Sequence, residues 1–297
     1  MKAMEARTRI QFKNVLFATD FSPAASAAAP FAAELAKRYG AKLYALHVRP
    51  PVVNPMTPPG TWRALEKAAL DEDMQHTQEL LSAFPGLRPE VLIKEGDLWS
   101  SLASVLEESD VDLVVIGTRG RSGIAKFLLG SAAEEIFRQA PCPVLTVGPN
   151  TAATEKKPGE ITRILFATDF SPASNAAAPY ALSLAQECQA HLTLLHVIAK
   201  PKPGELVQPR DLAQSWSQLL HKLVPDEADL WCVPEYVVEE GDPAEQIQAV
   251  ATRTGAELIV LGVHQPTGFP GAATHLPIAT AHKVVSHATC PVLTIRG

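Results

Sequence analysis

The chain repeats itself, and this repeat constrains its fold more than any other feature of the sequence. Residues 16–23 and 165–172 both read LFATDFSP. Four further blocks recur in the same order: 46–48 with 195–197, 95–97 with 240–242, 112–117 with 257–262, and 142–146 with 290–294. The chain is therefore a tandem duplication of one unit of about 145 residues.

The length of 297 residues suits two domains of ordinary size. The polar stretch 148–159, GPNTAATEKKPG, holds two Pro and two Gly and is typical of a linker. We place the boundary near Ala152, with units at 1–150 and 160–297.

Each unit alternates short apolar runs with helical segments. Runs at 15–18, 42–48, 90–94, 111–117 and 144–147 predict strands, and Ser22-Pro23 and Asp97 predict helix starts. The fold class is α/β: two doubly wound, Rossmann-like units, each a five-stranded mostly parallel sheet flanked by helices. Pro30 and Pro179 are expected to kink or split the first helix of each unit.

Composition excludes several classes of protein. The chain has 46% hydrophobic and 20% charged residues and a net charge of −6, so it is globular and has no basic surface for nucleic acid. Its N-terminus resembles no secretory signal and no apolar run is long enough to span a membrane, so a cytoplasmic protein is expected. The four cysteines have no redox or zinc spacing and are interpreted as reduced, mostly buried thiols.

The loop at 117–131, GTRGRSGIAKFLLGS, follows a buried strand and opens a helix. Glycines bring backbone N–H groups close to phosphate oxygens, and a helix N-terminus favours an anion. A serine hydroxyl and three cations would assist: Ser131, Arg119, Arg121 and Lys126. The loop is neither a Walker A motif nor a GxGxxG motif, and an ordinary surface turn is the alternative.

The pattern Gly117-x2-Gly120-x9-Gly130-Ser131 resembles the nucleotide-binding signature of the universal stress protein family. The Thr-Asp-x-Ser turn, the His-Val at 47–48 and the closing Pro-Val-Leu also resemble that family, over both halves. The resemblance implies an adenine nucleotide alpha hydrolase-like fold that binds ATP and Mg²⁺. It implies these binding residues: Ala18, Asp20, Val48, Gly117, Gly120, Gly130, Ser131 and Ala132, with Asp20 also near the metal. Thr19, Arg119 and Arg121 complete the predicted binding site.

Four of these residues have simpler interpretations. Asp20 could merely cap the turn before the first helix. Val48 could be core packing, and the arginines could be solvated side chains. The neighbouring His47 is interpreted as a core or turn histidine rather than a catalyst.

The second half departs from the signature. Gln265 replaces Gly120, and Ile278 and Ala279 replace Gly130 and Ser131. Its loop contains three prolines, and no Lys or Arg occurs between residues 262 and 283. The hypothesis is that only the first half binds ATP; alternatively, the second pocket binds something uncharged, since Asp169 and Val197 remain.

The resemblance implies a stress-response, nucleotide-binding regulatory protein and not an enzyme, with at most weak ATP hydrolysis. A slow ATPase or phosphotransfer enzyme and a nucleotide-independent scaffold are the alternatives. Strands 144–147 and 292–295 are expected to pair within the chain as a pseudo-dimer, and a further homodimer is possible. The Pro-rich segments 50–60 and 201–209 are interpreted as mobile loops beside the pockets.

Overall fold

The fold is described from a computed structural model. It describes residues 10–50, 61–118, 130–148, 151, 159–198, 209–225, 233–263 and 275–297. The first unit contains β1 (Asn14–Thr19), α1 (Pro23–Tyr39), β2 (Lys42–Arg49), α2 (Trp62–Ala83), β3 (Glu90–Glu95), α3 (Leu98–Glu108), β4 (Leu113–Gly117), α4 (Ser131–Gln139) and β5 (Val144–Val147). The second contains β6 (Arg163–Ala167), α5 (Pro172–Cys188), β7 (His191–Ile198), α6 (Pro209–His221), β8 (Glu235–Glu240), α7 (Pro243–Thr254), β9 (Leu258–Val263), α8 (His275–His287) and β10 (Val292–Arg296).

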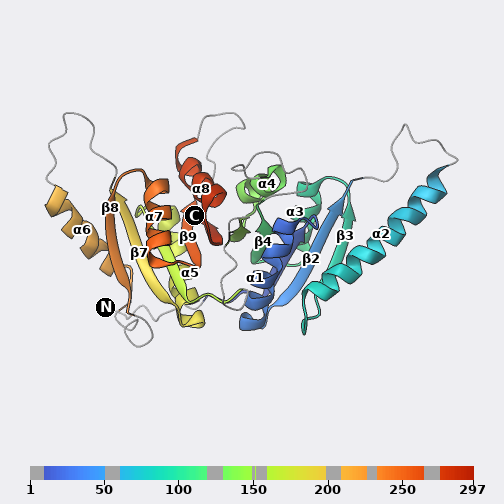
Figure 1. The fold of residues 1–297 in the computed structure, drawn as a ribbon, viewed down its shortest axis with the longest axis horizontal. Helices are drawn as coiled ribbons and strands as arrows, with labels where there is room; N and C mark the ends of the chain where they lie inside the picture. The colour runs from blue at the N-terminus through green and yellow to red at the C-terminus, as the bar shows by residue number, and fades with distance from the viewer. Residues whose placement is uncertain are drawn as a thin grey trace.

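The ten strands form one sheet in the order β3-β2-β1-β4-β5-β10-β9-β6-β7-β8. The first five strands pair in parallel with one another, and the second five repeat the same order. Figure 1 shows the two halves side by side, with α2 and α6 at opposite ends. The expected α/β architecture, five mostly parallel strands per unit, is confirmed.

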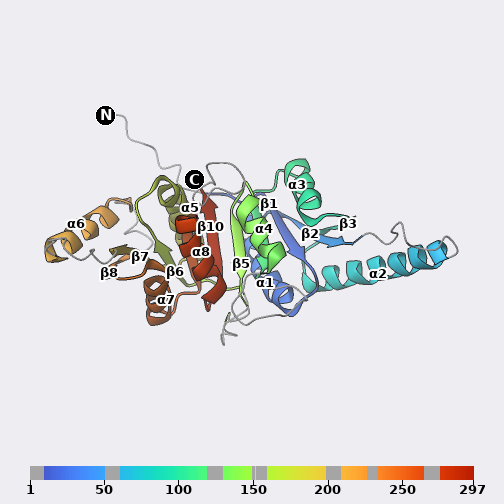
Figure 2. The same cartoon turned by 90° about the horizontal axis from the view of Figure 1, so that it is seen from above.

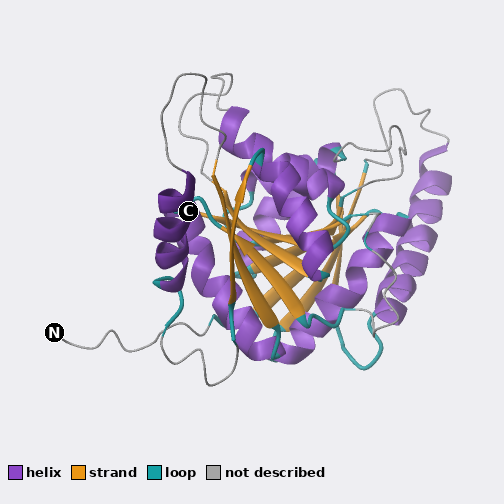
Figure 3. Cartoon of the chain, turned by 60° about the vertical axis from the view of Figure 1, so that its left-hand side comes forward, coloured by secondary structure: helices purple, strands orange, loops and turns teal. Residues whose placement is uncertain are grey.

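Helices cover both faces of this sheet (Figure 3). One buried cluster contains side chains from α1, α2, α5 and α6, and the other contains side chains from α3, α4, α7 and α8. Each cluster includes residues of both units. The apolar strands are thus buried on both sides, as parallel sheets require.

The closing strands of the two units pair antiparallel, as expected, and this pair joins the half-sheets (Figure 2). Leu145 and Leu293 are register partners and both are buried. Thr146 Oγ1 donates a 3.0 Å hydrogen bond to the Val292 carbonyl, and Thr294 Oγ1 donates one of 3.2 Å to the Val144 carbonyl. The pairing covers two strand edges that would otherwise be open to other chains.

Further contacts between the units lie outside the backbone pairing of these two strands. The Ile10 N–H donates to Ser183 Oγ at 2.9 Å, and Arg38 donates to the Glu187 carbonyl at 2.7 Å. Arg296 donates to the Phe137 carbonyl at 3.0 Å. The two units are therefore packed together rather than only tethered by the linker.

The first helix of each unit is not split at its proline, which was one of the two expected effects. α1 runs continuously through Pro30 and α5 through Pro179. Side-chain caps at Ser22 and Ser171 begin the two helices. Alanines on either side of each proline are buried, and their packing offsets a lost hydrogen bond that costs roughly 3 kcal/mol.

The cysteines were expected to be reduced and mostly buried thiols. Burial raises the pKa of the Cys142 and Cys290 thiols to about 12 and that of Cys188 to about 11, and all three are free. Cys232 lies outside the described residues, as do 51–60 and 201–208 of the Pro-rich segments.

In the described ranges, no helix has the length and apolar character needed to cross a bilayer.

Candidate functional site

A pocket of about 190 Å³ lies at the carboxyl ends of β1, β2 and β4. β1 sits between β2 and β4, so the strand order reverses here. Open α/β sheets bind ligands at such a point. The pocket is lined by Ala18, Thr19, Asp20, Ala25, Leu46, Val48, Leu98, Ile116, Gly117, Ala132, Ala133 and Ile136.

The turn after β1 sets the position of Asp20. Thr19 Oγ1 accepts from the Phe21 N–H at 2.9 Å, and Asp20 Oδ1 accepts from the Ser22 N–H at 3.0 Å. Phe21 has a φ of 60°, which is uncommon for a residue with a large side chain. Asp20 therefore does cap the turn, and it also lines the pocket.

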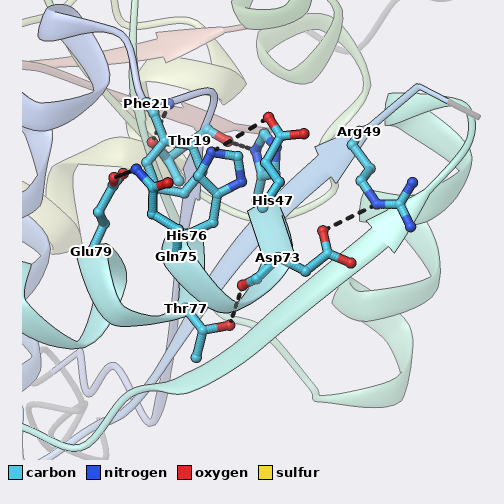
Figure 4. Close-up of polar contacts among 10 residues, drawn as sticks. Thr19, Phe21, His47, Arg49, Asp73, Gln75, His76, Thr77 and Glu79 are labelled. Carbon is cyan, nitrogen blue, oxygen red and sulfur yellow. Dashed lines mark hydrogen bonds and ion pairs between the residues drawn. The ribbon is translucent and has the colours of Figure 1, made fainter. Parts of the chain in front are cut away.

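An aromatic cluster supports this turn from α2 and β2. His47 is buried, and its Nδ1 lies 2.9 Å from the Thr19 carbonyl oxygen. The Phe21 ring stacks on His76 at 4.1 Å and meets His47 edge-on at 4.8 Å (Figure 4). His47 thus has the structural role expected of a core histidine.

An ion-paired arginine fixes α2 beside the end of β2. The Arg49 guanidinium lies 3.1 Å from Asp73 of α2 (Figure 4). It also lies 2.6 Å from Glu95 at the end of β3. The side chain is mostly shielded from solvent, with 20% exposed. This arrangement holds the helix that carries His76 against the sheet.

Gly117 has a packing role that the sequence interpretation did not include. A Cβ atom at this position would lie 2.5 Å from the carbonyl carbon and oxygen of Ala24. At Gly262 a Cβ would lie 2.3 Å from the Ala173 carbonyl oxygen. Both units need glycine here because the strand passes close to the start of a helix, whatever the pocket binds.

The start of α4 lies at the edge of the first pocket. Gly130 is the N-cap residue and has no side chain to accept a hydrogen bond. By contrast, α1, α3, α5 and α7 are capped by Ser22, Asp97, Ser171 and Asp242. The N–H groups of Ser131, Ala132 and Ala133 belong to the first turn and have no partner within the helix. They form a place where an anion is favoured.

An equivalent pocket of about 140 Å³ lies in the second unit. It is lined by Ala167, Thr168, Asp169, Ser174, Leu195, Val197, Pro243, Ile247, Leu261, Gly262, Thr280 and Ala281. Most of these occupy the positions of the first pocket's residues in the repeat. Ser174 stands where the first unit has Ala25, and Thr280 where it has Ala132.

The two pockets differ at the helix that closes them. Ala132 and Ala133 are the second and third residues of α4, but their counterparts Thr280 and Ala281 are the sixth and seventh of α8. α8 therefore begins about one helical turn earlier. From the fifth residue of a helix onward, each N–H bonds to a carbonyl within the helix, so these two offer no donor to a ligand.

The carboxylate of the second pocket is held in its charged form. Burial alone would raise the pKa of Asp169, but hydrogen bonds from Ser171 and Ser174 lower it below the ordinary value. The Ser171 N–H donates to Asp169 Oδ1 at 3.0 Å. None of the described residues that line either pocket carries a positive charge.

The structure brings six of the predicted residues together around the first pocket: Ala18, Thr19, Asp20, Val48, Gly117 and Ala132. Gly130 and Ser131 form the adjoining helix start and are not among its lining residues. Arg119, Gly120 and Arg121 lie outside the described residues. Six lining residues were missed: Ala25, Leu46, Leu98, Ile116, Ala133 and Ile136. Their signal in the sequence, an apolar residue at a strand end or helix start, does not distinguish a pocket wall from core.

Comparison with known proteins gives matches across the whole chain. A universal stress protein of Mycolicibacterium smegmatis is 26% identical over 297 aligned residues, covering 95% of this chain and 96% of that protein. Universal stress protein Rv1996 of Mycobacterium tuberculosis is 25% identical, covering 95% and 94%. The crystal structure of a universal stress protein from Archaeoglobus fulgidus superposes with a TM-score of 0.69 at 20% identity, covering 97% and 99%, and shows the same fold.

The family match is found twice, once for each half of the repeat. The universal stress protein family matches residues 11–148 and again residues 160–296. These two matches span nearly all of both five-stranded halves. The chain therefore belongs to the universal stress protein family, with two of its domains in tandem.

Proposed function

We propose that the first unit binds ATP with Mg²⁺ and that the protein acts as a nucleotide-binding regulator of a stress response. Nucleotide binding is typical of the family. The observation that carries the proposal is the pocket whose edge is the uncapped start of α4, at the reversal point of the sheet. Phosphate groups bind at such helix starts through backbone N–H groups.

The pocket divides into an apolar part and a polar part. Leu46, Val48 and Ile116 offer apolar walls suited to a base. Thr19 and Asp20 lie nearby and offer acceptors for ribose hydroxyls. In the sequence, Arg119, Arg121 and Lys126 fall between Gly117 and the start of α4, so they supply positive charge to the same connection.

Asp20 is the residue that would hold Mg²⁺ together with the phosphates. Mg²⁺ commonly binds through one or two carboxylates, substrate phosphates and water. In the described part of the chain, no three His, Cys, Asp or Glu side chains are grouped as a metal site. The single carboxylate fits a metal that arrives with the nucleotide, and the ion would neutralise phosphate charge.

Binding rather than rapid turnover is the proposed activity. One carboxylate that also caps a turn is a poor candidate for a general base, because Asp20 Oδ1 already accepts from the Ser22 N–H. Any ATP hydrolysis is expected to be slow. Phosphate release measured with purified chain in excess Mg-ATP tests this, and turnover faster than about 1 s⁻¹, the low end of ordinary enzymes, contradicts it.

The second unit is proposed not to bind ATP. The supporting observation is that Thr280 and Ala281 lie inside α8, where their N–H groups are already used. The connecting sequence contributes prolines and no Lys or Arg.

Calorimetric titration of matched variants with Mg-ATP tests the assignment to the first unit. Asp20→Asn and the double variant Gly130→Val, Ser131→Ala are expected to weaken binding at least about tenfold, the loss of one charged contact or more. Asp169→Asn is the control in the second unit and is expected to leave the affinity unchanged. Unchanged affinity in the double variant, or a loss in Asp169→Asn, would refute the assignment.

A further inference from the structure

We propose that the second-unit pocket binds an uncharged nucleoside, so that the chain holds a nucleotide site and a nucleoside site together. The inference rests on the proposed function of the first unit, because the occupant is argued from the likeness of the two pockets.

Three apolar wall residues occupy the same positions in the two pockets. Leu195, Val197 and Leu261 stand where the first pocket has Leu46, Val48 and Ile116. Gly262 repeats the close strand–helix approach of Gly117. A flat base that fits between the walls of the first pocket therefore meets the same surfaces in the second.

The turn that carries the carboxylate is also repeated. Phe170 has a φ of 61°, and its N–H donates to Thr168 Oγ1 at 3.0 Å. His196 Nδ1 lies 2.9 Å from the Thr168 carbonyl oxygen, as His47 does from Thr19. Trp216 takes the place of His76, stacking on Phe170 at 5.4 Å between ring centroids. The contacts that hold the turn bearing Asp169 are therefore all present in the second unit. The helix start that favours an anion in the first pocket is not repeated at the second.

The second pocket has hydroxyl groups at two positions where the first pocket has methyl groups. Ser174, in place of Ala25, accepts a 3.0 Å hydrogen bond from Thr168 Oγ1, and its Oγ lies 3.1 Å from the Ser171 carbonyl oxygen. Thr280 adds a second hydroxyl in place of the Ala132 methyl. A carboxylate has about four acceptor positions, so Asp169 can accept from ribose hydroxyls as well as from Ser171.

The same pocket disfavours a phosphate group. The α8 N–H groups at the pocket are paired within the helix, and Pro277, in its first turn, has no N–H at all. Apolar walls with hydroxyl acceptors and no anion-binding group suit a base and sugar without phosphate.

Two blocking variants and one probe test the inference. Ala132→Phe places a ring in the first pocket, and Thr280→Phe places one at the matching position of the second. Adenosine and Mg-ATP are each titrated calorimetrically into the full-length wild type and into both variants, with circular dichroism to establish folding. Adenosine is also titrated into wild type saturated with Mg-ATP, which needs no variant.

The expected result is that Ala132→Phe binds one adenosine per chain, and that Thr280→Phe weakens this second-unit binding at least tenfold. Wild type saturated with Mg-ATP is expected to bind one adenosine. The inference is overturned if adenosine binds neither Ala132→Phe nor saturated wild type, or if Mg-ATP binds the second pocket as tightly as adenosine. Failure of wild type to bind Mg-ATP refutes the proposed function instead, and the adenosine titration of Ala132→Phe still decides the second pocket.

Discussion

The Nδ1 atom of His47 lies 2.9 Å from the carbonyl oxygen of Thr19, and His196 repeats this distance to Thr168 in the second unit. A carbonyl oxygen can only accept, so Nδ1 carries the hydrogen and donates. In each unit the imidazole ties the end of one strand to the turn that bears the pocket carboxylate. These turns are therefore fixed by buried contacts in both units, independently of any ligand.

Stability is expected to fall in mild acid because of His196. Burial lowers the pKa of its imidazole, against the opposing effects of the Thr168 carbonyl and the Asp169 carboxylate. The unfolded state, with a pKa of about 6.5, therefore takes up the proton first as the pH falls. The free energy of unfolding should decrease below about pH 6.5 and level off below the folded-state pKa.

Urea unfolding at several pH values between about 7 and 5 checks this, because the slope with pH reports the difference in bound protons. His196→Gln should show a shallower decrease than the wild type. The exposed His191 is the control, and His191→Gln should keep the wild-type slope. Parallel curves for wild type and His196→Gln would rule out the contribution.

Alanine at either strand-end glycine is expected to destabilise the protein. The new Cβ would lie 2.5 Å or less from backbone atoms of the facing helix, in Gly117→Ala and Gly262→Ala alike. Relieving such overlap costs about 1–3 kcal/mol of unfolding free energy. Gly130, with a φ of −63°, is the control, and Gly130→Ala should cost less than about 1 kcal/mol. If Gly117→Ala destabilised the protein strongly and Gly262→Ala did so only slightly, overlap with the facing helix would not be the common cause of the destabilisation.

The junction of the two units is expected to stabilise both of them. Leu293 is 2% exposed and pairs in register with Leu145, so Leu293→Ala should cost about 2–5 kcal/mol in urea unfolding. Leu70, 60% exposed on α2, gives a control variant expected to change stability by less than about 0.5 kcal/mol.

Hydrogen exchange in the same Leu293→Ala variant reports where the stability is lost. Exchange should accelerate in both β4 and β9, because each lies next to one of the closing strands. Acceleration confined to β9 would contradict the coupling of the two units.

Much of the fold could be predicted because the repeat, the alternation and the caps agree with one another. The pairing of 144–147 with 292–295 was expected from the family resemblance, since closing strands pair between subunits in family dimers, and it covers two strand edges. The effect of Pro30 could not be predicted, because the loss of one hydrogen bond is local while the alanine packing that offsets it depends on the whole sheet. The helix propensity of proline alone carries no information about that packing.

The site was predictable where a motif names a residue and not where a wall is formed by packing. Asp20 and Val48 lie at the pocket because they end strands that meet at one edge. The packing role of Gly117 could not be seen, because it depends on how closely β4 approaches Ala24. The sequence also did not show that α8 begins about one turn earlier than α4. Counting residues back from Cys290 aligns the positions of the two units but does not say which of those positions are helical.

The central claim is that the two pockets share their walls but only the first accepts phosphate. Calorimetric titration of nucleotide-free, full-length chain with Mg-ATP, interpreted for stoichiometry, tests it most directly. The account predicts one site per chain, lost in the Gly130→Val, Ser131→Ala variant. Two sites of similar affinity would contradict it, because the second pocket would then bind phosphate without the first-turn N–H donors that the start of α4 offers to the first pocket.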